Sequence, residues 1–422
     1  MRVTEIDVGA TVTSNETDGA LMPLALSPIP AGGTRIAWYG GGQAHVTTLG
    51  ADDQINAAVA EVKLAAHDFQ DILADNAGGA VLLTRDAQGG GTLNCGQPTN
   101  LCGTPPSPAI ACYDMYLARF DSGSETWATK LTAASAAHPP YLNSATDASN
   151  VIFVWWYMHE GRLVTDGTNY AAYFGAAISV SQNSCVNIHQ GDRMQVVGPS
   201  GSLLSGHNSF DWGCSHSGYE RIVWDQSQSK FVTVCKNDAP TGGKSGRLAL
   251  APNTTTISPL DLWYGNVGDV VVAEGGGYWV IESDLRSGQT ADSAGLADVH
   301  LLHFTSGAPD KDLILASDAG QNDRAPHLVT YGNHLLAVWE KSSSTGDLAF
   351  RSTGRTMVLQ VLDRKTGAAI GTPVTVPSSG IGSVYGNRYY AFKAFPDGSV
   401  AFPSPGSSAS KLKILRVLPC AD

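Results

Sequence analysis

The chain has 422 residues, a formal net charge of −12, 47 glycines and 9 tryptophans, and only 15% of its residues are charged. Such a composition is typical of many short strands joined by tight turns, and not of disordered or coiled-coil chains. An acidic chain without a cluster of Lys and Arg argues against nucleic acid as a partner. No apolar run approaches the roughly 20 residues that span a bilayer.

The predicted strands follow a degenerate repeat: an apolar strand, a tight turn rich in Asp, Gly and Asn, and a second strand with aromatic and small residues. In chain order, the units lie at 34–62, 68–86, 161–177, 219–235, 269–284, 327–342 and 390–404. Third strands are predicted at 113–121, 192–198, 298–304 and 357–367. A turn-to-turn spacing of about 50–65 residues with four strands per unit is typical of β-propeller blades.

We therefore predict an all-β fold, a seven-bladed β-propeller that forms a single domain over residues 1–422. Six or eight blades are the alternatives, because an extra apolar hairpin at 141–158 fits no unit. The last unit has three strands, and a free strand at 2–12 precedes the first unit. Pairing that strand with the last blade would close the ring and remove two exposed sheet edges. Tandem immunoglobulin-type domains would need linkers that the sequence lacks.

The cysteines indicate the cellular compartment of the protein. Of the 7 cysteines, three lie within 86–112, a Pro-, Gly- and Thr-rich stretch that we interpret as a loop inserted into the domain. Clustered cysteines in a loop favour disulfides, and hence a secreted protein of the extracellular space or the periplasm. Met1 precedes polar sequence directly, so we expect a signal peptide to have been removed. A cytosolic protein with free thiols is the alternative.

The strand–turn rhythm resembles secreted bacterial β-propeller proteins in general, over nearly the whole chain. Signatures of particular families are missing from the sequence, among them the WD40 Gly-His and Trp-Asp pairing and the sialidase box. A fold alone does not assign a function, so the site is argued from the residues.

Titratable residues are enriched just before the expected inner strands, where loops enter near the central channel. Asp269 holds this position in its unit, and the segment 185–224 is the densest cluster. The ligand-binding candidates are His67, Asp68, His159, His189, Asp192, Asp211, Arg324, His327 and Arg388. They predict a polar pocket at the channel mouth that binds a glycan or a small polar ligand, in a protein expected to be a monomer. In the structural alternative, these side chains cap backbone N–H groups.

A catalytic hypothesis uses His216, Tyr219 and Arg221. A His is a base near neutral pH, a Tyr can donate a proton, and an Arg neutralises a carboxylate. The trio is similar to the equipment of propeller-type polysaccharide lyases such as ulvan lyases. That resemblance implies β-elimination in glycans that contain uronic acids. In the alternative, Tyr219 lies in the core and Arg221 forms a surface ion pair. A structural scaffold without a ligand is the third function that the sequence leaves open.

A metal site is the last hypothesis. Two Cys and two His suit tetrahedral zinc, and the candidates are Cys185, His189, Cys214 and His216. A Cys185–Cys214 disulfide explains the same residues more simply. Ca²⁺ could instead use Asp68, Asp71 or Asp75, although their spacing matches no known loop.

Overall fold

The computed structural model describes thirteen stretches of the chain, and every regular element in them is a β-strand. The stretches are 1–14, 22–86, 102–104, 113–132, 151–154, 161–210, 220–237, 247–250, 266–286, 295–305, 309–346, 354–376 and 390–419. None of them forms a helix able to cross a lipid bilayer. The all-β prediction is thus confirmed.

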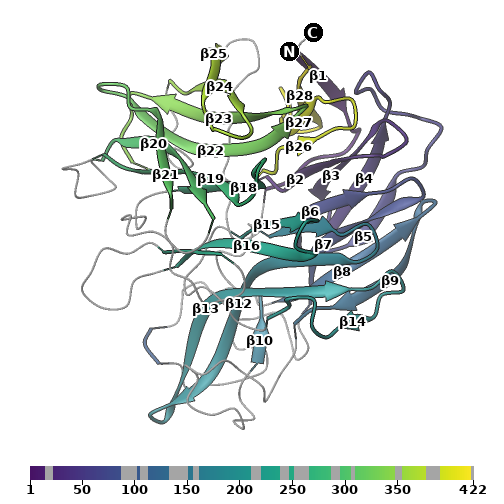
Figure 1. Ribbon diagram of the computed structural model, residues 1–422. Helices are drawn as coiled ribbons and strands as arrows, with labels where there is room; N and C mark the ends of the chain where they lie inside the picture. Colours follow the sequence, from purple (N-terminus) through teal and green to yellow (C-terminus); the bar gives the residue numbers. More distant parts are fainter. Residues whose placement is uncertain are drawn as a thin grey trace.

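The strands fall into seven antiparallel sheets arranged around an axis, as in a β-propeller (Figure 1). The innermost strands are β2 (Leu24–Pro28), β6 (Asp68–Ala74), β11 (Arg162–Thr165), β15 (Arg221–Asp225), β18 (Asn266–Val272), β22 (Asn322–Tyr331) and β26 (Lys393–Ala394). Each innermost strand contacts the next one along the chain, and β26 contacts β2, so the seven strands form a closed ring.

Each innermost strand is followed outward by further strands of its own sheet. The second strands are β3 (Thr34–Gly40), β7 (Gly78–Asp86), β12 (Tyr170–Gln182), β16 (Lys230–Asn237), β19 (Tyr278–Leu285), β23 (His334–Ser342) and β27 (Val400–Pro405). The third strands are β4 (Gln43–Leu49), β8 (Tyr113–Asp121), β13 (Cys185–Val197), β17 (Arg247–Leu250), β20 (Ala297–Phe304), β24 (Thr356–Asp363) and β28 (Lys411–Val417). The outer strands are β5 (Val62–Ala65), β9 (Ser124–Lys130), β14 (Leu203–Leu204), β21 (Lys311–Ala316) and β25 (Ala369–Val376).

The N-terminal strand closes the ring, as predicted. β1 (Arg2–Asp7) pairs antiparallel with β28 over its whole length, from Arg2 opposite Arg416 to Asp7 opposite Lys411. The last sheet therefore contains both ends of the chain, and β1 covers the edge of β28 that would otherwise be exposed.

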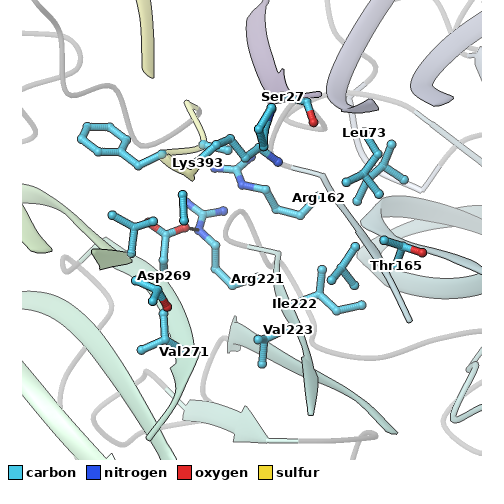
Figure 2. A pocket seen from close by; sticks show the side chains of 18 of the residues that line it. Ser27, Leu73, Arg162, Thr165, Arg221, Ile222, Val223, Asp269, Val271 and Lys393 are labelled. Carbon is cyan, nitrogen blue, oxygen red and sulfur yellow. Dashed lines mark ion pairs between the residues drawn. The ribbon is translucent and has the colours of Figure 1, made fainter. Parts of the chain in front are cut away.

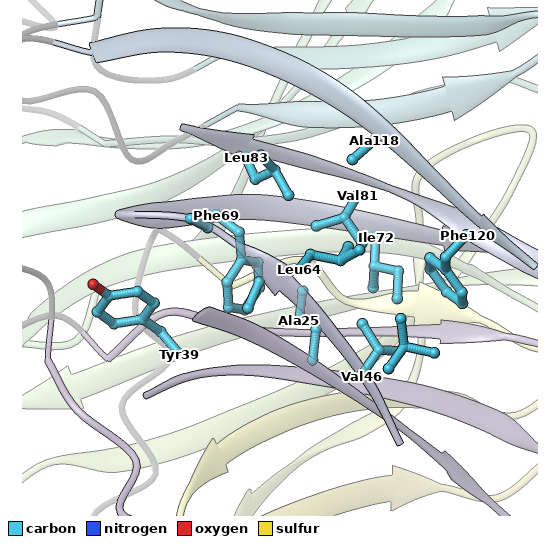
Figure 3. Packing of buried hydrophobic residues seen from close by; sticks show 14 residues of the cluster. Ala25, Tyr39, Val46, Leu64, Phe69, Ile72, Val81, Leu83, Ala118 and Phe120 are labelled. Carbon is cyan, nitrogen blue, oxygen red and sulfur yellow. The ribbon is translucent and has the colours of Figure 1, made fainter. Parts of the chain in front are cut away.

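The core lies between neighbouring sheets, and strand alternation explains why the second strands are continuously apolar. Along β7, Val81 and Leu83 pack in a cluster with residues of the preceding sheet (Figure 3). Ala80 and Leu82 point the other way and pack against the following sheet. Because successive side chains of a strand face opposite sides, a strand covered on both faces needs apolar residues at every position.

The extra hairpin at 141–158 does not add an eighth sheet to the described structure. Its described part contains β10 (Val151–Phe153), which pairs with β12 and so joins the third sheet. The predicted insertion at 86–112 lies almost entirely outside the described residues, so the domain boundaries remain a prediction.

Candidate functional site

A cavity of about 450 Å³ occupies the central channel. All seven innermost strands contribute to its lining, so the ring itself creates the cavity. The charged residues that line it are Arg162, Arg221, Asp269 and Lys393, whose side chains converge from four strands (Figure 2).

Arg162 and Arg221 occupy equivalent positions, because each is the first residue of its innermost strand. In both, Nη1 donates to the carbonyl oxygen of the preceding residue at 3.1 Å, Gly161 in one case and Glu220 in the other. Both side chains are almost fully buried. The two neighbouring blades thus place two guanidinium groups in the same way at one level of the channel.

Asp269 joins Arg221 to His327. Its Oδ1 lies 3.3 Å from Nε of Arg221, and its Oδ2 lies 3.1 Å from Nδ1 of His327. The backbone N–H of Leu328 also donates to Oδ2, at 3.2 Å. Burial alone would raise the pKa of Asp269, but the hydrogen bond and charge of His327 and the charges of Arg221 and Arg162 outweigh it and lower the pKa to about 2. Asp269 is therefore a permanent anion at neutral pH.

A β-bulge accounts for the position of Asp269. The pairing of β18 with β19 shifts register between Val267 and Val270, so Asp269 is left out of the ladder. A bulge bends the strand and re-aims the extra side chain. Gly268 makes the bend possible, because a Cβ there would lie 2.4 Å from the carbonyl oxygen of Pro326.

Lys393 forms a second ion pair at the cavity. Its Nζ lies 2.8 Å from Oδ2 of Asp71, which also accepts the backbone N–H of Leu163 at 3.0 Å. Asp71 is fully buried and lies behind the cavity lining, whereas the side chain of Lys393 is 16% exposed. We call Arg162, Arg221, Asp269 and Lys393 the charged layer.

The remaining lining is mostly apolar and more exposed toward the ends of the strands. Along β11, exposure rises from buried Arg162 to half-buried Val164 and Thr165, and in β15 it rises from buried Arg221 to half-buried Ile222 and Val223. Leu73, Ile222 and Val271 line the cavity beside this layer (Figure 2). The charged layer therefore forms the floor of the channel at the start of these strands, and the channel opens toward their ends.

Of the predicted site residues, the structure brings Arg221 and His327 together, through Asp269. His327 is fully buried and stacks on Phe392, with ring centroids 4.2 Å apart, so it supports the floor from behind. Arg324 is also fully buried, and its Nε donates to Oδ1 of Asn322 at 3.0 Å. Arg324 does not line the cavity.

The other described candidates lie away from the cavity. His67 contacts Asp86 through Nε2 at 2.5 Å and stacks on Tyr113, while the buried Asp68 accepts the N–H of Phe69. Asp192 is fully buried and accepts the hydroxyl of Tyr173. Burial and Asp192 together raise the pKa of Tyr173 well above its usual value. These contacts agree with the structural alternative, in which such side chains satisfy local polar groups.

Several predicted residues lie outside the described part of the chain: His159, Asp211, Cys214, His216, Tyr219 and Arg388. The backbone of His189 belongs to β13, but its side chain is not described. The proposed base and acid of the lyase hypothesis therefore stay predictions, and only its third member, Arg221, is placed.

The zinc hypothesis and the Cys185–Cys214 disulfide are wrong for Cys185, because this residue forms a disulfide with Cys102. A sulfur engaged in a disulfide is not the thiolate that zinc binds. The three Asp residues considered for Ca²⁺ have separate partners: Asp68 a backbone N–H, Asp71 Lys393, and Asp75 Arg119. In the described ranges, no group of three or more His, Cys, Asp or Glu side chains could hold a metal ion.

Sequence reasoning missed Arg162 and Lys393. Arg162 stands at the same place in its unit as Arg221, so alignment of the units would have found it. Lys393 gives no such signal, because its strand β26 has only two residues.

Comparisons with known proteins identify no family for this chain. No family model matches the chain, and no curated protein matches it. Among solved structures, a glucose dehydrogenase shares 9% identity with a TM-score of 0.42 over 100% of both chains. The soluble aldose sugar dehydrogenase of Escherichia coli shares 11% with a TM-score of 0.40, over 99% of this chain and 100% of the other. A thermostable family-43 glycoside hydrolase shares 12% with a TM-score of 0.34, over 61% and 88%. Likeness at this level transfers neither ligand nor activity.

Proposed function

We propose that the protein is an extracellular β-propeller that binds a small polar ligand, or the end of a glycan, in its central channel. The observation that carries this proposal is the 450 Å³ cavity with charged groups from several blades on its floor. Ligand pockets have volumes of about 300–1,000 Å³ and are mostly apolar with a few fixed polar groups. A cavity of this volume holds a small ligand or the end of a glycan.

The state of Asp269 does not suit a general acid or a general base. A general base or acid works best when its pKa lies near the working pH. The pKa of Asp269 is lowered to about 2, so its carboxylate is a weak base and carries no proton to donate. Its contacts with Arg221 and His327 suit a group that fixes these two side chains in place.

The extracellular assignment rests on the sulfur chemistry. Cys102 and Cys185 are joined in a disulfide, and Cys235 is also disulfide-bonded. Disulfides persist in oxidising compartments and are rare in the cytosol.

A thermal-shift screen of monosaccharides, oligosaccharides and small metabolites tests the proposal, with Ala394→Trp as the blocking variant. Ala394 is exposed and lines the channel, so an indole there would fill the cavity. Ala409→Trp is the matched control, because Ala409 is an exposed residue of the same blade away from the channel. We expect a ligand that stabilises the wild type and Ala409→Trp but not Ala394→Trp. A ligand that stabilises all three equally would place the site elsewhere, and a screen without ligands would favour the scaffold.

The lyase hypothesis is tested in the same protein. Uronic-acid polysaccharides are incubated with it, and unsaturated products are followed by their ultraviolet absorbance. Product formation that His216→Ala abolishes would replace the binding proposal with an enzymatic one.

A further inference from the structure

Lys393 is one of four charged residues in the described lining of the channel, with Arg162, Arg221 and Asp269. Asp71 pairs with Lys393 from behind the lining, and does not itself line the cavity. The ammonium group of Lys393 therefore lies between Asp71 and the cavity. A ligand group that contacts this ammonium is favoured if it is negatively charged.

Lys393 is the cation best placed to contact a ligand. An ammonium group has three N–H donors. Within the described part of the chain, Nζ of Lys393 donates to Asp71, which leaves donors for a ligand. The side chain is 16% exposed, against near-complete burial of Arg162 and Arg221. Because Asp71 holds Nζ in position, an anion in the cavity would meet a donor that is already oriented.

The wall of the cavity beside the charged layer favours a ligand with an apolar body. Leu73, Ile222, Val271, Leu328 and Phe392 line the cavity from five different blades. The hydroxyl groups around the rim of a sugar ring would lose hydrogen bonds to water against such a wall. An aliphatic or aromatic body would instead gain free energy from burial of apolar surface.

We infer that the channel binds a small organic acid, with one carboxylate at Nζ of Lys393 and an apolar body along the wall. The inference rests on the proposed function and narrows its ligand class. A monoanionic carboxylate suits the floor better than a phosphate dianion, because Asp269 lies in the same layer and repels a second negative charge more strongly.

The test is isothermal titration calorimetry with four probes that separate charge from apolar surface. Cyclohexanecarboxylate is acidic and apolar, cyclohexylmethanol is neutral and apolar, glucuronate is acidic and polar, and glucose is neutral and polar. We expect cyclohexanecarboxylate to bind most tightly, and loss of its charge or of its apolar surface to weaken binding about tenfold in either case. Inorganic phosphate, added as a competitor, should displace cyclohexanecarboxylate poorly.

Lys393→Met removes the charge with little change of shape and should weaken cyclohexanecarboxylate about tenfold without affecting cyclohexylmethanol. Lys411→Met is the matched control, since Lys411 forms a surface ion pair with Glu5 on the same blade. The variant leaves Asp71 without its lysine, so Lys393→Met/Asp71→Asn is measured as well, and circular dichroism checks that each variant folds. The double variant should show the same loss of acid binding.

Results other than the expected ones contradict the inference, and some of them also bear on the proposed function. Equal affinity for cyclohexanecarboxylate and cyclohexylmethanol, or full acid binding by the folded double variant, overturns the inference. Binding of glucose alone also overturns it but supports the proposed function. Failure of all four probes overturns the inference, while the screen with Ala394→Trp decides separately on the proposed function. Efficient competition by phosphate would contradict the choice of a carboxylate.

Discussion

Arg416 and Asp53 form a bidentate ion pair that joins the last blade to the first. Nη2 of Arg416 lies 2.6 Å from Oδ1 of Asp53, and Nε lies 3.0 Å from Oδ2. Both side chains are buried, and Arg2 of the closing strand also contacts Oδ2, at 2.6 Å. Arg416 and Arg2 come from opposite ends of the chain. A single carboxylate in the first blade therefore holds both strands that close the ring.

Asp53→Ala should destabilise the protein by about 3–5 kcal/mol, because removal of one partner leaves a buried guanidinium without its counter-charge. Urea unfolding followed by tryptophan fluorescence measures the loss. Asp52→Ala is the control, since Asp52 is exposed and its side chain accepts the local N–H of Gln54 at 3.1 Å. An equal effect of the two substitutions would mean that the ion pair does not stabilise ring closure.

Cys185→Ser should lower stability by about 2–5 kcal/mol, the range for loss of a native disulfide. The bond joins residues 83 positions apart and ties the segment around Cys102 to the start of β13. Cys102→Ser and the double variant should cost the same as Cys185→Ser in urea unfolding, because all three remove one bond. Additive losses from the two single substitutions would show that each cysteine acts separately.

The blades were predictable because their turns carry a chemical signature. Asp75, Asp166 and Asp225 each follow or end an innermost strand, and Oδ1 of each accepts backbone N–H groups two and three residues later. This contact makes Asp favourable in a tight turn, and it recurs once per blade in these three blades. Short strands such as β14 and β17 have two and four residues and no comparable signal.

The candidate site was predicted only in part, because the channel floor depends on contacts between blades. His327 and Arg221 belong to units separated by about two blades, and both were singled out, yet Asp269 links them through a bulge that no local pattern indicates. Asp71 and Lys393 are 322 positions apart. Their meeting follows from closure of the ring, and alternation within a single strand carries no information about it.

Gly268→Ala should destabilise the protein by about 1–3 kcal/mol, the usual cost of overpacking. A Cβ at this position would lie 2.4 Å from both the carbonyl oxygen of Pro326 and Cγ2 of Ile281. The backbone must then shift where it presents Asp269, so ligand binding should weaken together with stability. Gly320→Ala provides the comparison, since its Cβ meets nothing within 4 Å and only its positive φ of 71° is unfavourable. Unchanged binding by a destabilised Gly268→Ala would separate the bulge from the site.

Asp323 should make stability depend on pH in a direction opposite to that of an ion-paired carboxylate. The side chain is fully buried, and burial together with the charge of Asp318 raises its pKa from 3.8 to about 6. The folded protein therefore binds more protons than the unfolded chain between these two values. This contribution to stability is present below pH 3.8 and is lost as the pH rises through about 6.

Asp323→Asn removes this titration, so the variant should gain about 1–3 kcal/mol relative to the wild type at pH 7 and lose the advantage near pH 4. Urea unfolding of both proteins across this range gives the difference directly, and other titrating groups cancel because they are common to both. Asp318→Asn should shift the wild-type transition to lower pH, since it removes the neighbouring negative charge that helps to raise the pKa of Asp323. A difference between wild type and Asp323→Asn that does not change with pH would mean that Asp323 is ionised throughout, and that burial at this position does not oppose its charge.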